Sequence, residues 1–176
     1  VSDMCRSGRG CAWPDEVVFV TALFDDTTEM TPAGLTRAAT SDSHERRREA
    51  LVQRGEALLA WDCRLVLFAE PALMPRLKAA RLRASGENGR KRTRFVPMEL
   101  IDSKYAVHFA ALRAMFDEKR QPAGAGAARS PIHVLRRWTK LHCLDAALRA
   151  FPTPQTSAFY WINFDAMQTA LPPEPS

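Results

Sequence analysis

The stretch Val17–Leu23 reads Val-Val-Phe-Val-Thr-Ala-Leu, and it decides the class of fold. Its β-branched and apolar residues run on without polar alternation, which is typical of a strand that is buried on both faces. Pro14 precedes the run, and Asp25 and Asp26 follow it, so turn-forming residues mark both ends. A strand of this kind belongs in a parallel sheet that helices cover on either side.

Three further segments have the composition of strands. Arg64–Ala69 is a second buried run, Arg94–Pro97 is a short run that ends in proline, and Phe159–Ile162 is large and apolar. Segments with the helical spacing of apolar residues lie between the strands, at 44–61, 72–83, 103–119 and 131–151. A turn is expected at 85–89. The order β-α-β-α-β-α-α-β predicts an α/β fold, a mostly parallel sheet with helices on both faces.

The last of these helices is the strongest prediction. Ser130 and Pro131 supply an N-cap and a first-turn proline. The expected apolar stripe consists of Leu135, Trp138, Leu141, Leu144 or Leu148, and Phe151.

A single domain accounts for most of the chain. The chain has 176 residues, of which 46% are hydrophobic and 26% are charged, as in ordinary globular proteins. We expect a flexible N-terminal segment at 1–15, one α/β domain at 16–170 with loops at 26–43 and 119–130, and a disordered tail at 171–176. No transmembrane segment or signal peptide is visible, which favours a cytoplasmic location.

Basic residues are concentrated between Arg76 and Arg94. This segment holds eight Lys and Arg residues against the single acid Glu87, within a chain of net charge +5. The pattern is typical of a solvated helix face followed by a basic loop, and it also fits an acidic partner or a phosphate-bearing substrate. Aromatic residues do not interleave with these cations, which makes nucleic acid an unlikely partner.

Several familiar sites are disfavoured by the spacing of the residues. The cysteines and histidines lack zinc-site spacing, and Cys63 and Cys143 are expected to pack as small hydrophobic side chains. No G-x-G-x-x-G, P-loop or G-x-S-x-G motif occurs in the sequence. Dinucleotide-binding, P-loop and hydrolase interpretations are therefore not favoured.

The run from Phe159 to Asp165 combines a strand with two oxygen-bearing side chains at its end. Asn163 and Asp165 would share one face if the strand continues that far. Ligands of open α/β sheets bind at the carboxyl ends of strands, and oxygen ligands suit a hard divalent cation. Asn and Asp are equally ordinary residues of a turn, so both interpretations stay open.

Three sequence blocks, taken together, resemble one protein family. They are Val18–Asp25, Arg54–Glu70, and the pair formed by Trp138–Lys140 and Phe159–Asp165. In this order and spacing the chain resembles the HtrL/YibB-type proteins, which look like glycosyltransferases of the GT-A type. The resemblance covers roughly residues 16–170, because the blocks lie at both ends of the predicted domain.

The resemblance implies a GT-A/Rossmann-like half that binds a nucleotide-sugar donor at the strand ends, together with a divalent cation, Mn²⁺ or Mg²⁺. Thr21 and Asp25 would lie at the base or ribose of the donor, and Lys140 would neutralise a phosphate or fix a carboxylate. Asp165 is the first candidate ligand of the cation, and Asn163 would assist through its amide oxygen. Without the resemblance, Asp25 is a turn residue and Lys140 a surface lysine.

The chain departs from the family pattern in two respects. Asn163 stands where the family has Asp, and the chain ends where a GT-A enzyme continues with acceptor-binding elements. We therefore expect a glycosyltransferase or its donor-binding portion, truncated or degenerate, that transfers a sugar to an unassigned glycan or other acceptor in a divalent-cation-dependent reaction. The alternative is a non-catalytic α/β binding domain that uses the basic segment 76–94 for an acidic partner.

Overall fold

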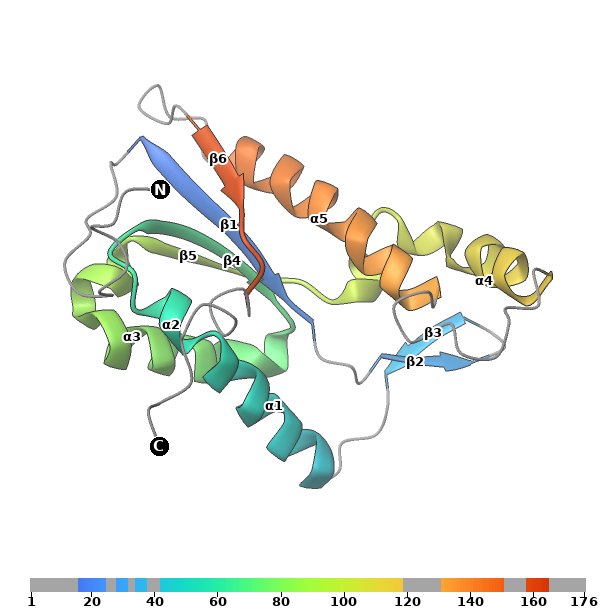
Figure 1. Ribbon diagram of the computed structural model, residues 1–176, viewed down its shortest axis with the longest axis horizontal. Helices are drawn as coiled ribbons and strands as arrows, with labels where there is room; N and C mark the ends of the chain where they lie inside the picture. The colour runs from blue at the N-terminus through green and yellow to red at the C-terminus, as the bar shows by residue number, and fades with distance from the viewer. Residues whose placement is uncertain are drawn as a thin grey trace, which may run out of the picture.

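The computed structural model describes residues 16–24, 28–31, 34–37, 42–118, 131–150 and 158–164. These residues form a four-stranded, all-parallel sheet with helices packed against it (Figure 1). The strands lie in the spatial order β5-β4-β1-β6, and their bounds are β1 (Val17–Leu23), β4 (Arg64–Ala69), β5 (Thr93–Pro97) and β6 (Ala158–Trp161). The predicted α/β class with a parallel sheet is confirmed.

The order of the strands reverses at β1. On one side β1 pairs with β4, where Leu23 lies opposite Ala69, and on the other side it pairs with β6, where Val20 lies opposite Trp161. The chain thus proceeds outward from β1 through β4 to β5, and then returns to the free side of β1 to form β6. In open α/β sheets such a reversal leaves a crevice at the carboxyl ends of the two strands, where ligands bind.

Helices cover both faces of the sheet (Figure 1). One face carries α1 (Asp42–Arg54), α2 (Glu56–Leu59) and α3 (Met74–Lys91), while α5 (Pro131–Ala150) covers the other face with α4 (Phe109–Glu118) beside it. Because side chains alternate along a strand, Phe19 and Leu23 of β1 join the core under α1–α3, and Val18 and Val20 join the core under α5. Strands β1 and β4 are central and buried on both sides, as the sequence predicts.

The helices differ from the predicted ranges at two glycines. The helix expected at 44–61 is divided at Gly55 into α1 and α2. The element α3 contains a kink at Gly86, where φ is 66° and ψ is −168°, so two helical segments meet inside the turn expected at 85–89. A residue without Cβ adopts this non-helical conformation at no steric cost.

Two other segments also depart from the prediction. The helix expected at 103–119 begins only at Phe109, after the short 3-10 turns η3 (Leu100–Asp102) and η4 (Ala106–His108). Within the loop expected at 26–43, β2 (Thr28–Thr31) and β3 (Gly34–Arg37) form an antiparallel hairpin. Strands of four residues carry too little apolar pattern to be recognised, so the loop prediction was wrong there. The ranges 1–15, 119–130 and 171–176 lie outside the described residues.

The buried face of α5 agrees with the predicted stripe only in part. Leu135 is completely buried and Leu144 packs against the core under α5, but Leu141 has an exposed fraction of 58% and Leu148, the alternative to Leu144, of 52%. The helix buries a row of residues spaced by four: Leu135, Thr139, Cys143 and Ala147. Small side chains in this row let the helix approach the valines of β1 closely.

Both described cysteines are buried, as predicted. Burial raises the pKa of the Cys143 thiol to about 12, and it also raises the pKa of Cys63. Because the thiolate is the reactive form, we expect neither thiol to react with iodoacetamide in the native protein near neutral pH, and both to react in concentrated guanidinium. Peptide mass spectrometry measures this, and labelling of either cysteine in the native protein would contradict the packing described here.

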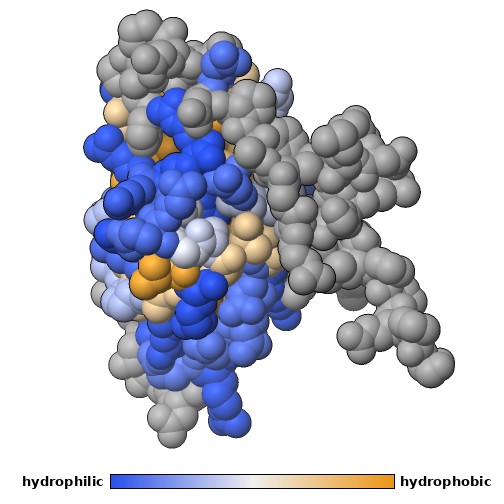
Figure 2. Space-filling view, turned by 90° about the vertical axis from the view of Figure 1, so that its left-hand side faces the viewer, coloured by the Kyte–Doolittle hydropathy of each residue, from blue (hydrophilic) through white to orange (hydrophobic). Residues whose placement is uncertain are grey.

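The side of the molecule that carries α3 is predominantly hydrophilic (Figure 2). Several cations of the basic segment are engaged by carboxylates there. Arg92 contacts Asp62 at 2.6 Å, Arg90 lies 2.8 Å from Glu87, and Arg76 contacts Glu45. These ion pairs are half-exposed or exposed, and the arrangement agrees with the solvated helix face that the sequence indicates.

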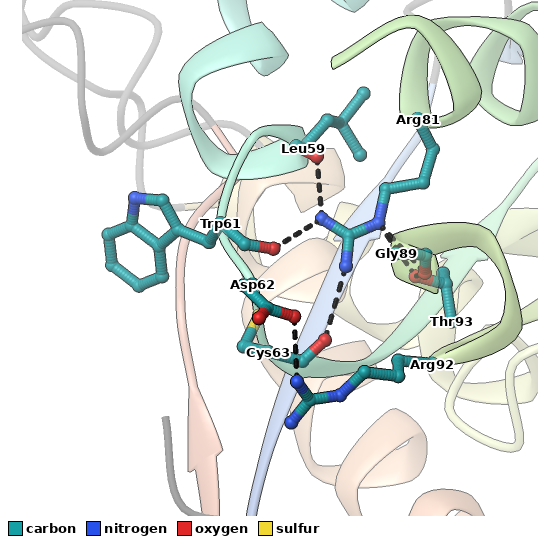
Figure 3. Close-up of polar contacts among 8 residues, drawn as sticks. All are labelled: Leu59, Trp61, Asp62, Cys63, Arg81, Gly89, Arg92 and Thr93. Atoms are coloured by element: carbon teal, nitrogen blue, oxygen red, sulfur yellow. Dashed lines mark hydrogen bonds and ion pairs between the residues drawn. The ribbon is translucent and has the colours of Figure 1, made fainter. Parts of the chain in front are cut away.

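Arg81 contradicts that description, because its side chain is completely buried. Its guanidinium donates hydrogen bonds to backbone carbonyls of the 59–63 segment, to the carbonyl of Gly89 in α3 and to one hydroxyl (Figure 3). The acceptors are the carbonyls of Leu59 at 2.5 Å, Trp61 at 2.7 Å, Cys63 at 3.1 Å and Gly89 at 3.2 Å, and Thr93 Oγ1 at 2.8 Å. Arg81 thereby joins the segments that lead into β4 and β5, at the amino ends of these strands and away from the carboxyl ends.

Candidate functional site

A cavity of about 410 Å³ lies where the strand order reverses. The last residues of β1, Ala22 and Leu23, line it together with Phe24, which follows them. The neighbouring strand contributes Trp161 and, just beyond its end, Asn163. The cavity therefore occupies the crevice at the carboxyl ends of β1 and β6 in which open α/β sheets hold their ligands.

One wall of this cavity is basic. The α5 residues His133, Arg136, Arg137 and Lys140 all line it, and their spacing of three and four places them along one side of the helix. Arg54, from the last turn of α1, also contributes. The described lining residues include no Asp or Glu, so the three arginines and one lysine give the lining a formal charge of +4. A concave site of one sign attracts ligands of the opposite charge.

The Lys140 ammonium is held in a defined position. Lys140 Nζ donates a hydrogen bond to Asn163 Oδ1 at 2.8 Å, and it lies 5.4 Å from the centre of the Trp161 ring. Trp161 Nε1 donates to the same amide oxygen at 3.1 Å. Because both neighbours are donors, the amide must present its oxygen to them. Both groups that hold Lys140 are neutral, so its positive charge stays uncompensated by these contacts.

The described residues do not fit a divalent cation. Such a cation requires several oxygen ligands, most of them carboxylates. The only side-chain oxygen of Asn163 already accepts two hydrogen bonds, and the ammonium beside it would repel a metal ion. Within the described ranges, no three His, Cys, Asp or Glu side chains are grouped as a metal site needs. Asp165 directly follows Phe164 but lies outside the described residues, so its role as a ligand stays a prediction.

The two predicted donor-binding residues of the first strand have different outcomes. Thr21 is completely buried, it projects from β1 on the side of Phe19 and Leu23, and it does not line the cavity. Its hydroxyl oxygen has no hydrogen-bond partner among the described residues. Asp25 directly follows Phe24 and lies outside them. Of the predicted site residues, the structure thus brings Lys140 and Asn163 together at the cavity.

Four basic lining residues were not singled out in the sequence: Arg54, His133, Arg136 and Arg137. A signal for three of them was available, because positions 133, 136, 137 and 140 recur with helical spacing around the one lysine that was considered. The apolar periodicity of this helix does not indicate the basic stripe on its other side. Arg54 comes from a different helix, and only the fold brings it to the cavity.

Phe164 fixes the chain segment that carries Asn163. Its ring is buried in the core under α1–α3 and lies directly against the backbone of Gly55. A Cβ added at Gly55 would lie 1.8 Å from Phe164 Cε1 and 2.0 Å from Cζ. The backbone of Gly55 has φ −91°, which any residue adopts, so the glycine is required by this contact and not by its conformation.

Replacing Gly55 with alanine is therefore expected to lower the free energy of unfolding by about 1–3 kcal/mol, the usual cost of overpacking a core. Urea unfolding measures the effect. In a Phe164→Leu background the smaller side chain leaves room for the added methyl group, so the same substitution should cost less there. An equal cost in both backgrounds would show that the two residues do not touch.

A second hollow, of about 480 Å³, lies between α4 and α5 and differs in chemistry. Its lining is mainly apolar and aromatic, with Trp138 and Leu141 of α5 and Tyr105, Leu112 and Met115 among the residues opposite. Among the described residues that line it, there is no Lys or Arg. An anionic ligand is therefore expected in the cavity at the strand ends and not in this hollow.

Comparisons of the chain with protein-family models, with curated proteins and with solved structures give no match. In the part of the chain that the structure describes, none of the helices has both the length and the apolar character needed to cross a bilayer. The functional inference consequently depends on the position and the charge of the cavity.

Proposed function

We propose that this chain is a glycosyltransferase or its donor-binding portion, and that the cavity at the ends of β1 and β6 binds the diphosphate group of a nucleotide-sugar. The observation that carries the proposal is the basic wall, which combines Arg54 with three cations of α5 at a strand-order reversal. Arginine and lysine are the side chains that bind phosphate groups in proteins. A concave site of this size is sufficient for such a ligand.

The cations have a defined task in this proposal. Transfer of the sugar leaves a nucleoside diphosphate. Negative charge grows on the phosphate oxygens as the bond between the anomeric carbon of the sugar and the diphosphate breaks. Cationic donors fixed in place beforehand stabilise that charge in the transition state. Lys140 suits this task, because Asn163 and Trp161 hold its ammonium before any ligand arrives.

The resemblance to GT-A enzymes also implies a divalent cation, Mn²⁺ or Mg²⁺, which would stabilise the same leaving group. Within the proposal its protein ligand is Asp165, two residues beyond Asn163. The described lining supplies no carboxylate for it. No step of the proposal therefore depends on a metal ion.

The alternative, an acidic partner bound by the basic segment 76–94, has less support. Arg81 is buried, and Arg76, Arg90 and Arg92 already contact carboxylates. A surface that must first give up its ion pairs gains less from a new acidic partner. Such binding would weaken steeply with added salt.

Isothermal titration with UDP and with GDP tests the proposal, and uridine, which lacks phosphate, is the matched control. The measurement is made in the presence of Mn²⁺, so that a metal-dependent site would also respond. We expect binding of at least one nucleoside diphosphate and none of uridine. If neither diphosphate binds to the folded chain, the proposed function is wrong.

A further inference from the structure

Asn163 decides how much charge the cavity offers to a ligand. A carboxylate at this position would form a salt bridge with Lys140 and cancel its charge. The amide that is present accepts the same hydrogen bond, at 2.8 Å, without neutralising the ammonium. A neutral partner therefore orients Lys140 and leaves its full charge for an anion.

Other residues that line the cavity also add positive charge to it. Arg54 and Arg137 bring two more positive charges to the cavity, and the described lining holds no acidic side chain. A nucleoside diphosphate carries two to three negative charges near neutral pH. Together with Lys140 these arginines supply three positive charges, which are sufficient to balance it without help from a metal ion.

The position of Asn163 also works against a metal ion at this wall. Its single side-chain oxygen is used by Lys140 and by the Trp161 indole, and the amide nitrogen left over cannot bind a cation. A divalent ion placed near this oxygen would meet the Lys140 ammonium at close range, and the two would repel each other.

We infer that the chain binds its diphosphate ligand through protein cations alone, with the Lys140–Asn163 pair in place of a bound metal ion. The inference rests on the proposed function, since it concerns the same cavity. It goes further, because it states that binding does not require a divalent cation. Lys140 supplies one charge at a fixed position, and the arginines complete the neutralisation.

The test is a titration of the chain with UDP in two buffers, one with EDTA and one with Mn²⁺. We expect the Kd to differ by less than about threefold between them. Binding that occurs only with Mn²⁺ would overturn this inference and leave the proposed function standing. If UDP fails to bind, the titration is repeated with GDP, and an absence of binding of both diphosphates in both buffers would overturn both.

The variant Asn163→Asp sharpens the test. Its carboxylate pairs with Lys140 and lowers the charge of the lining by one, so metal-free binding of UDP should weaken about tenfold. Because it also adds a metal ligand, Mn²⁺ should recover part of the loss. Asn88→Asp, on the exposed surface of α3, makes the same change far from the cavity and should leave binding unchanged. Equal binding by Asn163→Asp and the native chain in EDTA would contradict the role given to Asn163.

Discussion

Replacing Arg81 with leucine is expected to destabilise the fold by about 3 kcal/mol or more, which corresponds to a fall in Tm of roughly 6–12 °C for a chain of this size. The reason is that the guanidinium serves five acceptors in the interior. Leucine fills a similar space but donates to none of them, and buried carbonyls without donors are costly. Urea or thermal unfolding measures the change.

Two further variants separate the hydrogen bonds from the charge. Arg81→Lys keeps a positive charge, but its ammonium has three donors and lacks the planar fork that reaches the 59–63 segment and the 89–93 segment at once. The free energy of unfolding of Arg81→Lys should therefore fall by much of the amount expected for Arg81→Leu. Arg83→Leu, two residues along the same helix on its exposed side, should change stability by less than about 0.5 kcal/mol. Native stability in Arg81→Lys would show that the carbonyl contacts do not stabilise the fold.

Removing Arg137 and Lys140 together should abolish most of the binding of a nucleoside diphosphate. Each charge-assisted hydrogen bond contributes about 1.5–3 kcal/mol, so the double alanine variant is expected to lose about a hundredfold or more in affinity. Both side chains line the cavity without belonging to the hydrophobic core, so the fold should be retained. Isothermal titration with UDP measures the loss, and circular dichroism verifies the fold.

The matched control removes two cations elsewhere. Arg83 and Lys91 are exposed residues of α3, and replacing both with alanine changes the net charge by the same amount. If general attraction to a basic protein explained binding, this pair would weaken it as strongly as the cavity pair does. A loss confined to the cavity variant supports the site. An equal loss in both would show that general attraction to a basic protein, and not the cavity, explains the binding.

The two central strands could be predicted from the sequence, whereas the β2–β3 hairpin and the division of the first helix could not. Val17–Leu23 and Arg64–Ala69 are buried on both faces, so hydrophobic content alone marks them, and their bounds agree with the structure. The proline of β5 weakened that prediction, but β5 is an edge strand and Pro97 is its last residue, where no ladder hydrogen bond is lost. The strands of the β2–β3 hairpin have only four residues each, too few for a recognisable pattern, and Gly55 is required by its contact with the remote Phe164.

The site was predictable only in part, for a physical reason. The resemblance drew attention to Lys140 and Asn163, and the structure brings their side chains within hydrogen-bonding distance across 23 positions of sequence. The contacts of Arg81, in contrast, could not be predicted. Nothing in a run of basic residues indicates that one of them is buried and donates to backbone carbonyls. Charge patterns report where ionisable groups occur in the chain, while their burial depends on the packing of remote segments.

The most direct measurement is the rate at which individual lysines react with an acylating reagent, followed by mass spectrometry with and without saturating UDP. Lys140 lines the cavity, whereas Lys78 and Lys91 are exposed on α3. We expect that UDP slows the acylation of Lys140 and leaves the rates at Lys78 and Lys91 unchanged. An unchanged rate at Lys140, or protection of Lys78 and Lys91 instead, would contradict the claim that the cavity at the ends of β1 and β6 binds the diphosphate.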